Sequence, residues 1–199
     1  MIYEEAGALI KHVTRIAVHY PYFATGTIPA GKDKQAVDEK LIELYQTELD
    51  RVERQKRRRN GLSNARYLRC RHTWVLLVTK GMGSIWDAEP LKDMRETELI
   101  AFDYSIKLLS RSGKRYDVQT KISNEVWEEH ERLILANALR RSTSSLEAFF
   151  VLRAGNYTRT PFRGSMGQIT RLFDEINRRR KSAGLELLSR LVLGGRARS

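Results

Sequence analysis

Apolar residues recur at two different spacings along this chain: every three or four residues in some segments, and every second residue in others. The fold must therefore contain both helices and strands. Apolar residues recur every three or four positions from 3 to 20, which predicts a helix that Pro21 ends. The aromatic and Thr-rich residues 22–28 predict a short strand, and a start nearer Ile16 would shorten the helix before it. A second helical pattern runs from Lys34 to about Arg59, where Asn60-Gly61 supplies a stop.

The middle of the chain has the strand period of two. Residues 66–79 alternate throughout, which predicts one long strand. Residues 102–109 and 114–122 alternate on either side of Ser110-Arg111-Ser112-Gly113, a pattern typical of a hairpin. The apolar run 146–154 predicts a buried strand, and helices are expected from Ser123 or Asn124 to about 141 and from 165 to 182.

These elements predict an α+β fold. We expect an antiparallel sheet of four to five strands with helices packed on one face, plus helices at the N- and C-termini. The order resembles the layout of ferredoxin-like domains, and this resemblance of architecture carries no function. We expect a single domain over residues 1–190, followed by a flexible basic tail over 191–199.

Positive charge is concentrated in two segments. The 199-residue chain has 36 Lys and Arg against 24 Asp and Glu, a formal net charge of +12. Residues 51–72 hold nine basic residues and one acidic residue, and residues 153–199 hold eleven against three. Because like charges at this density repel one another, an anionic partner is the first expectation.

The predicted partner is therefore nucleic acid, bound mainly through its phosphate backbone, with RNA slightly favoured over DNA. An accessory subunit of a ribonucleoprotein or mobile-element complex is one such setting, and an interaction module for an acidic protein is the competing one. Tyr67 is expected to offer a stacking surface on an open sheet face. The predicted contact residues are Lys56, Arg57, Arg58, Arg59, Arg66, Tyr67, Arg69, Arg71, Lys107, Arg115, Lys121, Arg171, Arg178, Arg179, Arg180, Lys181, Arg196 and Arg198.

A catalytic alternative rests on the predicted hairpin. Asp103 would lie roughly opposite the triplet that contains Gln119 and Lys121. This set resembles the metal-dependent nuclease core in which a strand Asp is followed by Glu or Gln, any residue, and Lys on the next strand. The resemblance implies Mg²⁺ on Asp103, a Lys that positions the attacking water, and an upstream Glu such as Glu43 or Glu48. A solvated polar sheet face is the competing interpretation, and no cofactor is expected unless this alternative holds.

The single cysteine, Cys70, excludes an intramolecular disulfide and predicts a reducing, cytoplasmic compartment. Cys70 and His72 share the apolar side of the predicted long strand, which favours packing over metal ligation. No apolar run approaches the roughly 20 residues that a membrane-spanning helix requires, so no membrane partner is expected.

Overall fold

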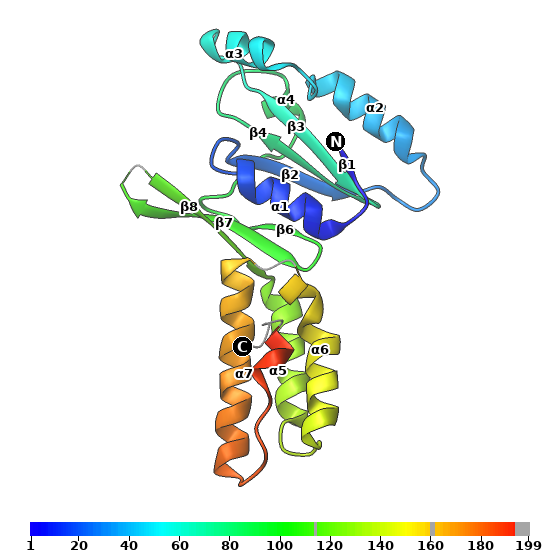
Figure 1. Cartoon of the computed structure of the whole chain (residues 1–199). Helices are drawn as coiled ribbons and strands as arrows, with labels where there is room; N and C mark the ends of the chain where they lie inside the picture. Colours follow the sequence, from blue (N-terminus) through cyan, green and yellow to red (C-terminus); the bar gives the residue numbers. More distant parts are fainter. Residues whose placement is uncertain (114, 160–161, 194–199) are drawn as a thin grey trace. The chain divides into compact units, whose positions relative to one another are not determined.

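The protein is a mixed α+β chain that divides into two compact units, Met1–Gln119 and Thr120–Ser199. The computed structural model describes residues 1–113, 115–159 and 162–193 (Figure 1). The α+β class is confirmed. The strands form two sheets instead of one, and the ferredoxin-like detail is not confirmed. The single domain over residues 1–190 stays a prediction.

The larger sheet lies in the first unit and has the strand order β1-β3-β4-β2-β5. β1 runs parallel to β3, whereas the other neighbours are antiparallel. The sheet is therefore mixed, unlike the antiparallel sheet that the sequence predicted. Its strands are β1 (Ile2–Tyr3), β2 (Tyr22–Thr27), β3 (Ala65–Cys70), β4 (Thr73–Val78) and β5 (Lys92–Asp93).

The predicted long strand over residues 66–79 is wrong, because the chain reverses between β3 and β4. Cys70 pairs with Thr73, so the turn consists of Arg71 and His72, and Arg71 has a φ of 55°. A two-residue turn preserves the alternation of apolar residues, and neither residue is the Gly or Asn that usually marks such a turn. Cys70 is buried as expected, but His72 is exposed at the turn.

Both faces of the larger sheet are covered along β3 and β4, where nine of the twelve residues are buried and the other three are half-buried. Residues at alternate positions of these strands pack with Leu41 and Tyr45, and Leu68, Val75 and Leu77 are buried on the opposite face. The open face on which the sequence placed Tyr67 and Arg69 therefore does not exist.

The predicted helix over residues 34–59 is two helices, α2 (Lys34–Tyr45) and α3 (Arg51–Arg59). Gln46 ends α2 with a φ of 48°, and Asp50 begins α3 by accepting a 2.8 Å hydrogen bond from the Glu53 backbone N–H. Asp at an N-cap satisfies an otherwise unpaired backbone donor. Asp50 therefore starts a second helix, although the helical spacing of apolar residues continues across the break. The other helices of this unit are α1 (Ala6–Ile16), as predicted, and the short α4 (Ile85–Ala88).

A second sheet has the order β6-β7-β8 and consists of β6 (Leu99–Ala101), β7 (Tyr104–Ser112) and β8 (Arg115–Ile122). The hairpin that the sequence predicted is therefore confirmed. Tyr104, Ile106, Leu108 and Ile122 are buried on its apolar side.

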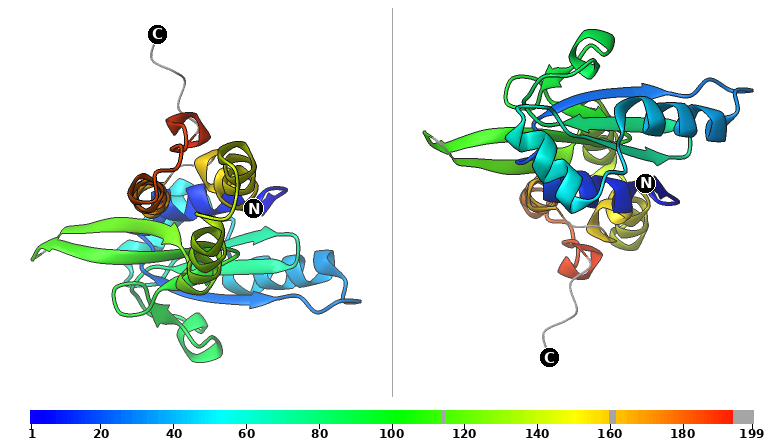
Figure 2. Two further views of the ribbon diagram at one scale, coloured as in Figure 1. Left: turned by 90° about the horizontal axis from the view of Figure 1, so that it is seen from below. Right: turned by 90° about the horizontal axis from the view of Figure 1, so that it is seen from above.

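The second unit is helical, with α5, α6 and α7 side by side (Figures 1 and 2). The strand predicted over residues 146–154 is wrong: the segment is helical, and it buries Leu146, Phe150, Ala154 and Tyr157 at helical spacing. A short apolar run does not by itself distinguish a buried strand from a buried helix. The elements are α5 (Asn124–Asn137), α6 (Thr143–Arg159), α7 (Arg163–Ser182) and a 3₁₀ turn, η1 (Arg190–Leu193).

Residues 191–193 of the predicted tail belong to η1, and residues 194–199 lie outside the described residues. Among the helices of the described ranges, none combines the length and apolarity required to cross a bilayer.

Candidate nucleic-acid interface

α3 is the most basic element of the first unit, and none of its nine residues is buried. Its sequence, Arg-Val-Glu-Arg-Gln-Lys-Arg-Arg-Arg, has six cations and one carboxylate. A helix normally gains most of its stability from an apolar face packed against a core, and α3 has no such face. It is attached to the unit by polar contacts.

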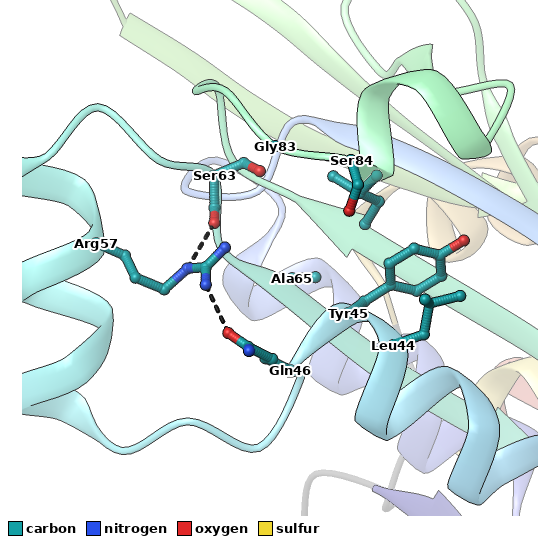
Figure 3. A pocket seen from close by; sticks show the side chains of 9 residues that line it. Leu44, Tyr45, Gln46, Arg57, Ser63, Ala65, Gly83 and Ser84 are labelled. Carbon is teal, nitrogen blue, oxygen red and sulfur yellow. Dashed lines mark hydrogen bonds between the residues drawn. The ribbon is translucent and has the colours of Figure 1, made fainter.

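Two arginines make these contacts. The Arg57 Nε donates to the Ser63 carbonyl at 3.1 Å, and its Nη1 donates to Gln46 Oε1 at 2.6 Å (Figure 3). The Arg54 Nη1 donates to the Leu49 carbonyl, and the Arg54 carbonyl accepts from Asn64 Nδ2 at 3.2 Å. Arg54 and Arg57 thus hold α3 against the loop that leads into β3, and both are half-buried.

The other four cations of α3 are exposed. Arg51, Lys56, Arg58 and Arg59 form no salt bridge with a carboxylate anywhere in the described part of the chain. Three of them lie in the last turn, where the helix dipole stabilises cations by about 0.3–1 kcal/mol. We refer to these four residues as the α3 cations.

A pocket of about 320 Å³ opens beside this helix. One face of α3 contributes Arg51, Arg54, Gln55 and Arg58, while Tyr20 and Asn64 complete the lining. None of these described lining residues is acidic. We call it the α3 pocket. A second pocket, of about 140 Å³, lies where Arg57 reaches Gln46 and Ser63 (Figure 3), so part of its polar lining is already paired.

Tyr67 and Arg69 belong to the core and not to a binding surface, which corrects the sequence prediction. They are 2% and 8% exposed, and both bind the buried carboxylate of Asp38. Tyr67 Oη donates to Asp38 Oδ1 at 2.7 Å, and Arg69 donates from Nε at 2.6 Å and from Nη2 at 2.7 Å. Burial acts to raise the pKa of Asp38, but the hydrogen bonds from Arg69 and Tyr67 outweigh it and hold the pKa below its ordinary value. Burial and the Asp38 carboxylate together raise the pKa of Tyr67.

The remaining sheet cations lie in different settings. Arg66 is half-buried on β3, and Arg71 is exposed at the turn, where its carbonyl accepts from Arg69 Nη1 at 2.7 Å. Arg115 is exposed on β8, and Lys107 is half-buried on β7. In the second unit, Lys121 is half-buried and its Nζ donates to Asn124 Oδ1 at 3.1 Å.

Arg180 is also wrong as a surface contact, because it is 2% exposed inside the second unit. Its guanidinium donates to the carbonyls of Ala138 (2.7 Å), Arg141 (3.1 Å) and Glu186, and to Thr143 Oγ1 at 3.0 Å. A cation at this position satisfies carbonyls at the C-terminal end of α5 that have no partner within the helix.

The other cations of α7 are partly neutralised. Arg178 and Arg179 both bind Glu175, and their hydrogen bonds lower the pKa of this carboxyl to about 2. Arg171 Nε donates to the Gly167 carbonyl at 3.2 Å, and Lys181 is exposed. Arg196 and Arg198 lie outside the described residues.

The structure does not assemble a carboxylate cluster for the nuclease alternative. Asp103 is exposed in the turn between β6 and β7, and Gln119 is exposed on β8. Within residues 1–113, 115–159 and 162–193, no three His, Cys, Asp or Glu side chains come together in a group able to hold a metal ion. Mg²⁺ on Asp103 stays a prediction.

The α3 pocket was not predicted, although the sequence indicates part of its lining. Arg51, Gln55 and Arg58 are spaced by four and three residues, which places them on one face of a helix. Tyr20 and Asn64 join this face only through the tertiary fold, so no local pattern reveals them.

Comparison with known proteins found no matching family model, no matching curated protein and no matching solved structure.

Proposed function

We propose that this protein binds nucleic acid, mainly through the phosphate backbone, and that the first unit makes its principal contacts through α3. The observation that carries the proposal is the group of four α3 cations, exposed on one short helix and without a carboxylate partner among the described residues. Arg and Lys at this density attract a polyanion, and each phosphate that they neutralise releases counterions.

The internal contacts of α3 support this assignment. Arg54 and Arg57 attach the helix, while Arg51, Lys56, Arg58 and Arg59 form no hydrogen bond through their side chains within the described segments. These side chains repel one another, and the helix dipole offsets only part of that cost; binding of phosphates lowers it further. Guanidinium groups suit this role because their planar fork matches a pair of phosphate oxygens.

Structured RNA is the favoured ligand, in an accessory subunit of a ribonucleoprotein or mobile-element complex. The exposed basic surface is rich in Arg, and Tyr67, the aromatic residue expected to stack on an unpaired base, is buried. This composition favours contacts with phosphates over stacking on single-stranded bases. Arg66, Arg71, Lys107 and Arg115 of the first unit extend the proposed set, together with Lys121, Arg171 and Lys181 of the second.

The test measures affinity for three ligands by fluorescence anisotropy of the full chain: a structured RNA, a DNA duplex of equal charge, and polyglutamate. A variant with Gln at all four α3 cations is compared with a charge-matched control that has Gln at the exposed Lys11, Lys32, Lys40 and Lys80. We expect both nucleic acids to bind the wild type, RNA more tightly, and the α3 variant to lose far more affinity than the control.

Two results would overturn the proposal. Polyglutamate binding as strong as RNA binding would assign the surface to an acidic protein instead. Equal losses in the α3 variant and the lysine control would show that only the total charge matters and that α3 has no special part.

A further inference from the structure

The α3 pocket differs from the rest of the basic surface because it is concave and lined by three arginines. Arg51 and Arg58 flank it from one face of α3, and Arg54 lies between them. The Arg54 Nη1 donates to the Leu49 carbonyl, which restrains this guanidinium beside the pocket. The remaining lining residues, Tyr20, Gln55 and Asn64, are polar and uncharged.

The three arginines of this pocket have more positive charge than one phosphate within a strand can neutralise. An internal phosphodiester has one negative charge and two non-bridging oxygens, whereas a terminal phosphomonoester has a charge of about −1.5 to −2 at pH 7 and three strong acceptor oxygens. Three arginines line one partly enclosed volume, and none of the described residues in the lining is acidic, so the pocket matches the more highly charged group better.

The volume and the neighbouring cations favour an end of a strand over an isolated ion. About 320 Å³ lies in the range of pockets that hold small organic ligands, so a terminal nucleotide is of suitable size. Arg59 is four residues beyond Gln55 and hence adjacent to the pocket face of the helix. Lys56 lies farther around the same helix, and these two cations are available to the diester backbone as it leaves the pocket.

We propose that the α3 pocket binds the terminal phosphomonoester of a nucleic acid strand, with Arg51, Arg54 and Arg58 around the phosphate. This inference rests on the proposed function, because it names the part of the nucleic acid that the same surface recognises.

The experiment compares two oligonucleotides of identical sequence, one with a 5′-phosphate and one with a 5′-hydroxyl, each labelled at the 3′ end. A 3′-phosphorylated partner with a 5′ label provides the same comparison at the other end. Binding is measured with the full chain, with the variant Arg51→Gln/Arg58→Gln, and with the control Lys56→Gln/Arg59→Gln. The control removes the same charge from the same helix but leaves the pocket lining intact.

We expect the wild type to bind an end-phosphorylated strand about tenfold more tightly than the hydroxyl strand, because a charged group gains several hydrogen bonds. The pocket variant should lose this preference. The control should keep it, while its affinity for both strands falls. Adenosine 5′-monophosphate, titrated alone, should bind more weakly than the phosphorylated strand, since it lacks the diester that reaches Lys56 and Arg59.

The outcomes separate this inference from the function on which it rests. Equal binding of phosphorylated and hydroxyl strands, with α3-dependent affinity for both, overturns the terminal-phosphate pocket and leaves nucleic-acid binding intact. Adenosine 5′-monophosphate binding as tightly as the phosphorylated strand makes the ligand a free nucleotide and overturns the strand-end assignment. No binding of any strand overturns both proposals.

Discussion

The buried Asp38 carboxylate should be the most sensitive electrostatic position of the first unit. Replacing it by Asn keeps the shape of the side chain but removes the charge that faces Arg69. The Arg69 side chain is 10% exposed and that of Asp38 is 5% exposed, so solvent does not substitute for the lost partner. Breaking a buried ion pair from one side costs about 3–5 kcal/mol, because the remaining charge stays buried without compensation. We therefore expect Asp38→Asn to lower the free energy of unfolding of this unit by about 3–5 kcal/mol.

The assay is urea unfolding followed by tryptophan fluorescence in a Trp127→Phe background. Trp74 and Trp86 then report on the first unit alone, since Trp127 is the only tryptophan of the second. Glu39→Gln serves as the control, because it removes a carboxylate from an exposed position of the same helix and should change stability by less than about 0.5 kcal/mol. The double replacement Asp38→Leu/Arg69→Met should be less damaging than the sum of the two single losses.

The pH dependence follows from the lowered pKa of Asp38. A carboxyl whose pKa is lower in the folded state than in the unfolded state contributes stability above its unfolded value, near 4, and loses this contribution as the pH falls through the folded value. Wild-type stability should therefore decline below about pH 4 more steeply than that of Asp38→Asn. Parallel pH profiles, or a cost below about 1 kcal/mol for Asp38→Asn, would refute this reasoning.

Three further predictions concern other parts of the chain. Arg180→Met should destabilise the second unit by about 3 kcal/mol, because the carbonyls that Arg180 satisfies lose a buried donor. The loss should appear as a lower urea midpoint in Trp127 fluorescence. An unchanged midpoint would show that these hydrogen bonds do not stabilise the unit. Gly164→Ala should cost about 2 kcal/mol in the same assay, since an added Cβ would lie 2.4 Å from the Thr120 carbonyl oxygen, and a neutral result would mean that the backbone shifts freely. Burial raises the pKa of the Cys70 thiol, so a thiol reagent at pH 8 should label it only at the rate of unfolding, whereas immediate labelling would show an open site.

Local patterns suffice for the elements that begin and end with clear signals. The helix that precedes Pro21, the strand after it and the last helix before Gly184 all follow from periodicity and stop residues. The reversal at Arg71 and His72 leaves the alternation unchanged and includes neither Gly nor Asn, so the sequence pattern of one long strand and that of two paired strands are the same.

The burial of charged residues depends on partners far away in the chain. Arg69 and its partner Asp38 are 31 positions apart, and Arg180 reaches carbonyls about 40 positions before it. Counting charges along the sequence therefore places both arginines on a surface, although each is internal. The same count also placed Lys56, Arg57, Arg58 and Arg59 on a surface. Three of them are exposed because α3 packs no apolar face against the core, whereas Arg57 is half-buried and binds Ser63 and Gln46.

The salt dependence of RNA binding shows directly whether the α3 cations contact phosphates. For the full chain, log K against log salt concentration should be steep and linear. If the four α3 cations each contact a phosphate, the slope should become shallower by about three to four when all four are replaced by Gln. The lysine control at Lys11, Lys32, Lys40 and Lys80 should keep a slope near that of the wild type. The same slope in the α3 variant and the wild type would show that RNA does not bind through the α3 cations.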